Sequence, residues 1–150
     1  MNILIFGGAG FVGRHYSEYF LKKNDYVKVI DNIAPLSGGT HPKKWKLFNP
    51  YKFKKKFKFL NQDCRKFFRV RLEKKYDLVI NLAAIVGGRE VIENNPLAVA
   101  EDLEIDTAFW RWVVKNKKKI RHVITYSSSC LLYTSPSPRD MRRSRMPSSA

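Results

Sequence analysis

Short apolar runs alternate along most of the chain with longer segments whose apolar residues recur at helical spacing. The short runs predict five strands, at Asn2–Phe6, Tyr26–Ile30, Phe57–Leu60, Asp77–Leu82 and His122–Tyr126. The longer segments predict helices over Phe11–Lys23 and Arg89–Lys115, and Pro96 marks a start or a kink in the second helix. Because strands and helices alternate, we expect an α/β fold in which helices cover both faces of a parallel, doubly wound sheet.

The composition is that of one folded domain. Of the 150 residues 44% are apolar, including 10 Phe, 7 Tyr and 3 Trp, which is enough for a core and excludes a disordered chain. The 29 Lys and Arg residues outnumber the 13 Asp and Glu residues, so the formal net charge is +16. Such a charge makes nucleic acid, an anionic membrane and a phosphate-bearing ligand candidate partners, and composition alone does not choose among them.

Cysteine and histidine are too sparse for a metal site or a disulfide framework. The chain has two cysteines, Cys64 and Cys130, and three scattered histidines, so we expect no metal and a reducing, cytoplasmic location. The N-terminus lacks a basic leader region, and the most apolar later stretch, residues 78–86, is too short to span a membrane. A membrane is therefore not an expected partner.

A basic belt, residues 43–75, holds 14 Lys or Arg residues against two acidic ones. In its first part the basic residues are interleaved with aromatic ones, Trp45, Phe48, Tyr51 and Phe53. Such interleaving can bind nucleic acid, but no RNA- or DNA-binding motif accompanies the charge. We therefore favour a long solvated connection and expect no nucleic acid. The alternative predicts salt-dependent binding that is lost when Lys54, Lys55 and Lys56 are neutralised.

A glycine-rich turn lies between the first predicted strand and the first predicted helix. Gly7 permits a tight turn, Gly10 lets backbone amides approach a pyrophosphate, and Gly13 lets the helix pack closely on the strand. The start of the helix then faces the negative charge. This is the structural context that a dinucleotide-binding turn requires.

Asp31 follows the glycine turn by 18 residues and ends the second predicted strand. At that position a carboxylate can accept hydrogen bonds from the ribose hydroxyls of adenosine. It would repel a 2′-phosphate on the same ribose, so the sequence favours NAD over NADP.

These motifs resemble the extended short-chain dehydrogenase/reductases, the NAD-dependent epimerase/dehydratase family, over residues 1–129. The resemblance implies a Rossmann-type doubly wound parallel sheet, here truncated after about the fifth strand, with NAD as cofactor and a nucleotide sugar as substrate. It also implies that Phe11 and Val12 stand where the turn touches the pyrophosphate, and that Asp63 and Cys64 lie against the adenine ring. The other implied cofactor contacts are Asn32, Leu82, Ala83, Ala84 and Asp102.

The serine run after the fifth predicted strand resembles the family's catalytic serine segment. The resemblance implies that Ser129 hydrogen-bonds the substrate oxygen that undergoes oxidation. Relatives place a Tyr-x-x-x-Lys pair after this serine, and its Tyr removes the hydroxyl proton. No lysine follows Ser129 in the 150 residues. We therefore expect this chain to bind the cofactor without completing the reaction.

The composition changes abruptly after Ser129. Residues 130–150 hold five Ser, three Pro and four Arg but no Lys, whereas the preceding 129 residues hold 18 Lys and seven Arg. We interpret residues 1–129 as an incomplete NAD-binding Rossmann domain. We interpret residues 130–150 as a non-native or disordered tail, a translated adapter or assembly artefact. A natural divergent tail is the alternative.

Two functions from different classes stay open. The first is the N-terminal cofactor-binding part of an NAD-dependent nucleotide-sugar epimerase or dehydratase, with hydride chemistry at a sugar carbon. The second is a non-catalytic NAD-binding sensor or interaction module with a basic surface. The resemblance also implies a homodimer formed through the helix predicted over residues 89–115.

Overall fold

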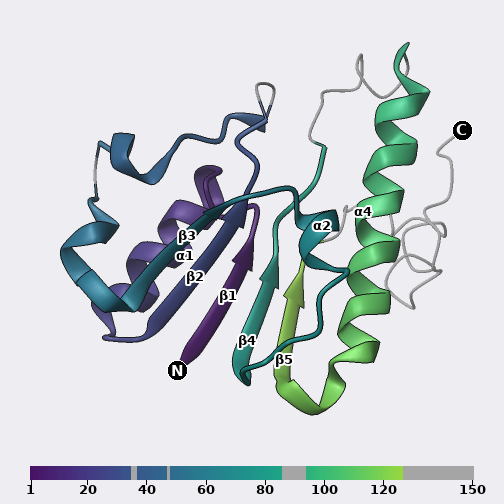
Figure 1. Ribbon diagram of the computed structural model, residues 1–150. Helices are drawn as coiled ribbons and strands as arrows, with labels where there is room; N and C mark the ends of the chain where they lie inside the picture. Colours follow the sequence, from purple (N-terminus) through teal and green to yellow (C-terminus); the bar gives the residue numbers. More distant parts are fainter. Residues whose placement is uncertain (35–36, 47, 86–93, 127–150) are drawn as a thin grey trace, which may run out of the picture.

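The computed structural model describes residues 1–34, 37–46, 48–85 and 94–126 of the chain. They form a five-stranded sheet in the order β3-β2-β1-β4-β5, and each neighbouring pair of strands is parallel (Figure 1). The chain extends the sheet from β1 first on one side and then on the other. All five strands therefore begin at one edge of the sheet, which we call the amino edge, and end at the opposite carboxyl edge.

The strands lie within two residues of their predicted bounds. They are β1 (Asn2–Phe6), β2 (Tyr26–Asp31), β3 (Phe57–Asn61), β4 (Tyr76–Asn81) and β5 (Ile120–Thr125). The α-helices of the described residues are α1 (Phe11–Lys22), α2 (Cys64–Phe67) and α4 (Pro96–Lys115). The short 3-10 helices are η2 (Pro42–Lys44), η3 (Pro50–Lys56) and η4 (Lys117–Lys119). None of the helices in these ranges is long and apolar enough to cross a membrane.

Helix α4 begins at Pro96, the residue at which the sequence predicts a start or a kink. Proline suits the first helical position, where its missing N–H costs nothing. Asn95 caps the helix, because its side chain accepts a hydrogen bond from the Ala98 N–H. Residues 86–93 lie outside the described ranges.

Side chains of alternate residues in the central strands pack in two separate hydrophobic cores, one on each face of the sheet. On one face Ile3 and Ile5 of β1 pack with Phe20 and Leu21 of α1. On the other face Leu4 and Phe6 pack in a second buried cluster with side chains of α2 and α4: Cys64, Phe67, Ile105, Phe109 and Trp112. Helices therefore cover both faces, as the alternating pattern predicts (Figure 1).

The aromatic residues of the basic belt pack mostly against this structure. Trp45 is buried, and Phe48 and Phe53 are partly buried against the α1-side core. The Trp45 ring is held further by a hydrogen bond of 2.8 Å from its Nε1 to the Thr40 carbonyl. Tyr51 is 40% exposed. The belt therefore does not present these aromatic rings as a continuous stacking surface.

Candidate functional site

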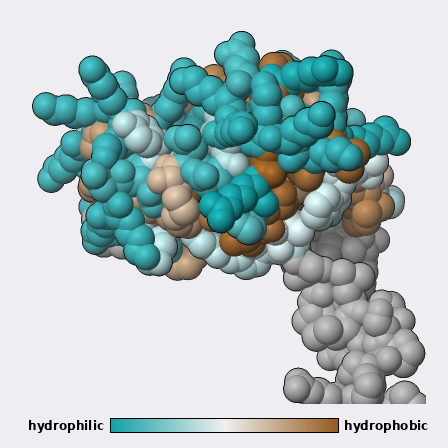
Figure 2. All heavy atoms as spheres, turned by 90° about the horizontal axis from the view of Figure 1, so that it is seen from below, coloured by the Kyte–Doolittle hydropathy of each residue, from teal (hydrophilic) through white to brown (hydrophobic). Residues whose placement is uncertain are grey.

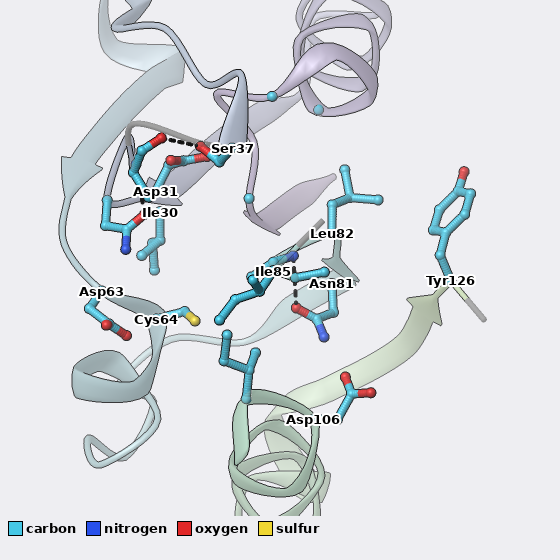
Figure 3. A pocket seen from close by; sticks show the side chains of 18 of the residues that line it. Ile30, Asp31, Ser37, Asp63, Cys64, Asn81, Leu82, Ile85, Asp106 and Tyr126 are labelled. Carbon is cyan, nitrogen blue, oxygen red and sulfur yellow. Dashed lines mark hydrogen bonds between the residues drawn. The ribbon is translucent and has the colours of Figure 1, made fainter. Parts of the chain in front are cut away.

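A cavity of about 600 Å³ opens at the carboxyl edge, between the ends of β1 and β4. This is the point where the strand order reverses, and ligands of open α/β sheets bind there. Its walls come from the turn after β1, the ends of β2, β4 and β5, the N-terminus of α2 and one side of α4 (Figure 3). Elements that are far apart in the sequence thus meet around one space.

The turn after β1 allows little room for side chains. Gly7 has φ +71°, and a Cβ there would lie 2.5 Å from the backbone of Leu82. A Cβ on Gly13 would lie 2.4 Å from the Cα of Gly8. Gly13 therefore brings α1 close to the turn itself rather than to the strand. Gly8, which the sequence analysis did not single out, lies against the side chain of Val29.

Gly10 differs from these glycines, because a Cβ there would meet only the Gly7 carbonyl, at 3.4 Å. It is the N-cap residue of α1, and no side chain caps this helix end or places an acidic group in its first turn. The first backbone N–H groups of the helix therefore face the cavity without a protein anion. Phe11 and Val12, both exposed, form the lip of the cavity at this point.

Asp31 ties the glycine turn to the end of β2. Its Oδ2 accepts a hydrogen bond of 2.8 Å from the Ala9 N–H, and its Oδ1 accepts one of 2.7 Å from the Ile33 N–H. The carboxylate is 8% exposed and lines the cavity. Each oxygen keeps acceptor capacity, so the same group can hold the turn and bind hydroxyls of a ligand.

Asp63 and Cys64 form the cavity wall at the start of α2. Asp63 caps α2 by accepting a hydrogen bond of 2.8 Å from the Arg65 N–H. The Arg65 guanidinium also donates to Asp63 Oδ2 and to Glu104 Oε2, each at 2.8 Å, and so links α2 to α4. The hydrogen bonds from Arg65 hold the pKa of Asp63 below its ordinary value. Burial raises the pKa of Cys64 to about 12, so this thiol is neutral and unreactive at physiological pH.

Asp102 does not line the cavity. Its Oδ1 accepts a hydrogen bond of 2.8 Å from the Ile85 N–H, so it fixes the segment that follows β4. Glu101 and Asp106, on either side of it in α4, face the cavity instead. Burial, and next the charge of Asp102, raises the pKa of Asp106.

At the end of β5, Tyr126 lines the cavity beside Thr125. Its hydroxyl lies 2.6 Å from that of Tyr16 in α1, and this hydrogen bond raises the pKa of Tyr16. The pair connects the end of β5 to the helix that begins at the glycine turn. Ser129, the predicted catalytic serine, and the whole of residues 130–150 lie outside the described ranges.

The structure brings twelve of the predicted site residues to this single cavity. They are Gly7, Gly10, Phe11, Val12, Gly13, Asp31, Asn32, Asp63, Cys64, Leu82, Ala83 and Ala84. Eleven further described residues line the cavity but were not among the predicted site residues: Ile30, Ala34, Ser37, Arg65, Asn81, Ile85, Glu101, Ile105, Asp106, Thr125 and Tyr126. Several of these adjoin a predicted residue at a strand end, a signal that was available. No such signal in the sequence indicated which side of α4 faces the cavity.

Comparison with known proteins identifies this arrangement. The sequence profile of the NAD dependent epimerase/dehydratase family matches residues 3–148. The chain belongs to this family. Its cofactor is NAD, as the sequence predicts. The chain is 31% identical over 126 residues to the bifunctional polymyxin resistance protein ArnA of Wigglesworthia glossinidia brevipalpis, covering 79% of this chain and 17% of that protein.

Solved structures share the fold. UDP-glucose 4-epimerase of Bifidobacterium longum, in complex with NAD+ and UDP, superposes with a TM-score of 0.70 at 23% identity over 92% of this chain and 40% of that one. UDP-N-acetylglucosamine 4-epimerase of Methanobrevibacter ruminantium gives 0.66 at 24% identity over 91% and 41%. These matches confirm the Rossmann-type sheet, and this chain spans well under half the length of each protein.

Proposed function

We propose that this chain is the NAD-binding N-terminal part of a nucleotide-sugar epimerase or dehydratase. The observation that carries the proposal is the convergence of the glycine turn, Asp31 and Asp63 on one cavity at the switch point of the sheet. The cavity offers the backbone approach, the ribose acceptor and the apolar wall that a dinucleotide requires. The family's NAD dependence supports this assignment.

The residues present fit NAD along the length of the cavity. The uncapped N-terminus of α1 and the open position at Gly10 suit the pyrophosphate. Asp31 would accept hydrogen bonds from the adenosine ribose, and the Asp63–Cys64 wall would lie against adenine. Ala83 and Ala84 leave space for the cofactor to rest on the ends of the strands.

Asp31 also determines which dinucleotide is accepted. Its carboxylate would lie against the ribose 2′ position, where a phosphate would meet like charge in a buried setting. Arg65, the basic residue that the described part of the chain contributes to the cavity lining, already forms ion pairs with Asp63 and Glu104. We therefore infer a preference for NAD over NADP.

In such enzymes bound NAD supplies hydride acceptance and return at a sugar carbon. The substrate class is supported by solved relatives described with UDP or with a nucleotide-linked sugar derivative. Within this chain we assign Ser129 to hydrogen-bonding the substrate oxygen, on the family resemblance. Because no Tyr-x-x-x-Lys follows Ser129 in the 150 residues, we propose that this chain binds NAD without turnover. We also retain the proposal that residues 1–129 are an incomplete NAD-binding domain and that residues 130–150 are a non-native tail.

Helix α4 supports the expected homodimer. Leu103, Trp110 and Val114 lie on its outer side at spacings of seven and four residues, and each is substantially exposed. Trp112, in contrast, is buried in the core. Light scattering should therefore give a dimer mass, and Trp110→Lys should give a monomer that still binds NAD.

The proposal is tested by calorimetric titration of the full chain with NAD and NADP, followed by assays with nucleotide sugars. We expect saturable NAD binding, at least about tenfold weaker NADP binding, and no sugar interconversion. Absence of NAD binding would refute the cofactor assignment. Measurable turnover would refute the statement that this chain is inactive alone.

A further inference from the structure

Lysines gather at the amino edge of the sheet, opposite the cavity. Runs of two or three lysines directly precede β3, β4 and β5, and another pair ends α1 just before β2. We define the amino-edge lysines as Lys22, Lys23, Lys54, Lys55, Lys56, Lys74, Lys75, Lys117, Lys118 and Lys119. Figure 2 looks onto this edge and shows hydrophilic side chains projecting over much of it.

The strand order arranges these lysines in a row. Across the sheet the sequence of groups is residues 54–56 before β3, 22–23 before β2, the amino terminus before β1, 74–75 before β4 and 117–119 before β5. Neighbouring strands are about 4.8 Å apart, so the row is about 20 Å long. Contacts between groups confirm this proximity. Lys56 Nζ donates to the Asn24 carbonyl at 2.9 Å, and Lys119 Nζ donates to the Leu72 carbonyl.

The ten lysines of the row outnumber the four acidic residues beside it, which are Glu18, Asp25, Glu73 and Asp77. Among the amino-edge lysines, the structure records an ion pair only for Lys22, with Glu18. Asp25, the carboxylate nearest the start of β2, is bound by the ammonium group of Met1. The contacts recorded for Lys56 and Lys119 are to neutral oxygens, which leave the charge of the row in place.

Two exposed aromatic rings lie among these charges. Tyr19 and Tyr26 are each 52% exposed. Lys23 Nζ lies 4.3 Å from the centre of the Tyr19 ring, and Lys56 Nζ lies 5.5 Å from that of Tyr26. Rings beside ammonium groups are the elements that bind bases and phosphates of an unpaired strand together.

Contrary to the expectation from the sequence, in which these lysines are separate runs, we propose that the amino edge binds single-stranded nucleic acid. A row one sheet edge wide matches the linear charge of one phosphodiester backbone better than it matches a plane of lipid headgroups. The surface is separate from the NAD cavity, because it lies at the opposite ends of the same strands. The two ligands can therefore be bound at the same time.

The test is fluorescence anisotropy of labelled oligo(U) and oligo(dT) of about 12 nucleotides, titrated with the full chain over a range of salt concentrations. The test variant replaces Lys55, Lys117 and Lys118 by Gln. The matched control replaces Lys43, Lys44 and Lys46 by Gln, which removes the same charge from the belt away from the strand starts. NAD titration of both variants verifies that the cavity is intact.

We expect the test variant to lose at least about tenfold in affinity and to lower the salt slope by about two, while the control changes affinity less than about twofold. NAD binding should be unchanged in both. Three results would overturn the proposal: no oligonucleotide binding by the native chain, equal weakening by the two variants, or binding to phosphatidylserine vesicles without binding to either oligonucleotide. None of these depends on whether NAD binds.

Discussion

The two edges of the sheet carry opposite chemistry on the same five strands. Among the described residues, the cavity at the carboxyl edge is lined by the acidic side chains of Asp31, Asp63, Glu101 and Asp106 and by one basic side chain, that of Arg65. The amino edge carries ten lysines in a row. The whole chain has a net charge of +16, so the acidic lining of the cavity does not follow from composition. It follows from where the acidic and basic residues lie relative to the strands. Residues directly after parallel strands meet at one edge, and residues directly before them meet at the other.

The edges also differ in how strictly their residues are constrained. At the carboxyl edge, backbone segments approach so closely that Gly7 and Gly13 leave no space for a Cβ. At the amino edge, most of the lysine side chains project into solvent. Substitutions at the first edge should therefore change folding or cofactor binding, whereas lysine substitutions at the second should change surface charge and the proposed nucleic-acid binding with little effect on folding.

The largest expected effect is that of Gly13→Ala. Its Cβ would lie 2.4 Å from the Cα of Gly8, and backbone atoms on both sides cannot move away cheaply. We expect the free energy of unfolding to fall by about 3 kcal/mol. Urea unfolding followed by circular dichroism measures it, with Lys55→Gln at the other edge as a control. A loss no larger than that of the control would contradict the close-packed turn.

Substitution of Asp31 should affect both the cavity and its cofactor preference. Asp31→Ala removes the acceptor of the Ala9 and Ile33 N–H groups and of the expected ribose hydroxyls. We expect NAD binding to weaken by about tenfold to a hundredfold. Asp31→Asn should bind NAD more weakly than the native chain and discriminate less against NADP. Calorimetric titrations with both dinucleotides decide this, and an unchanged NAD to NADP ratio would be inconsistent with it.

A smaller effect is expected at Asp102, which fixes the segment after β4. Asp102→Ala removes the acceptor of the Ile85 N–H, at a cost of about 1 kcal/mol in unfolding free energy. Asp102→Asn keeps an oxygen acceptor and should recover most of that loss. If the two variants were equally stable in thermal unfolding, the hydrogen bond to Ile85 would have no structural role.

Asp63 should make the carboxyl edge sensitive to acid. Its pKa is lowered by Arg65, so the ionised group stabilises the fold above its unfolded pKa, and that contribution is lost as pH falls through the lowered folded value. Asp63→Asn keeps the cap on α2 and removes the charge. We expect its melting temperature to lie below that of the native chain at pH 7 and to converge with it in acid. Parallel curves at all pH values would exclude the ion pair as the cause.

The smallest expected effect concerns Lys28, a lysine within strand β2. Burial, and next Lys58 and Lys74, lowers its pKa. The unfolded chain therefore binds more protons above the lowered folded pKa, so stability should rise as pH increases toward the ordinary lysine pKa. Lys28→Met should remove this slope and, because solvent screens much of the charge, stabilise the chain by only about 0.5 kcal/mol. Thermal unfolding from pH 7 to 10 compares the two chains.

The predictable features were those encoded by contiguous residues. Apolar runs placed the five strands within two residues, and the glycine spacing placed the turn that borders the cavity. Helix α2 was missed because its four residues are too short to show helical periodicity. The cavity-facing side of α4 was missed because it depends on how that helix packs against Phe6 and the strands. The row of lysines is four separate runs in the sequence, and only the strand order joins them.

The most direct test of the account is the NAD affinity of Gly10→Ala beside that of the native chain. A Cβ at Gly10 meets only the Gly7 carbonyl at 3.4 Å, so the variant loses only the preference of the N-cap of α1 for glycine over alanine and should melt within about 5 °C of the native chain. Because the added methyl would occupy the space assigned to the pyrophosphate, its NAD affinity should be at least about tenfold lower. Equal NAD binding by the folded variant, or none by the native chain, would contradict the assignment of this cavity to the dinucleotide.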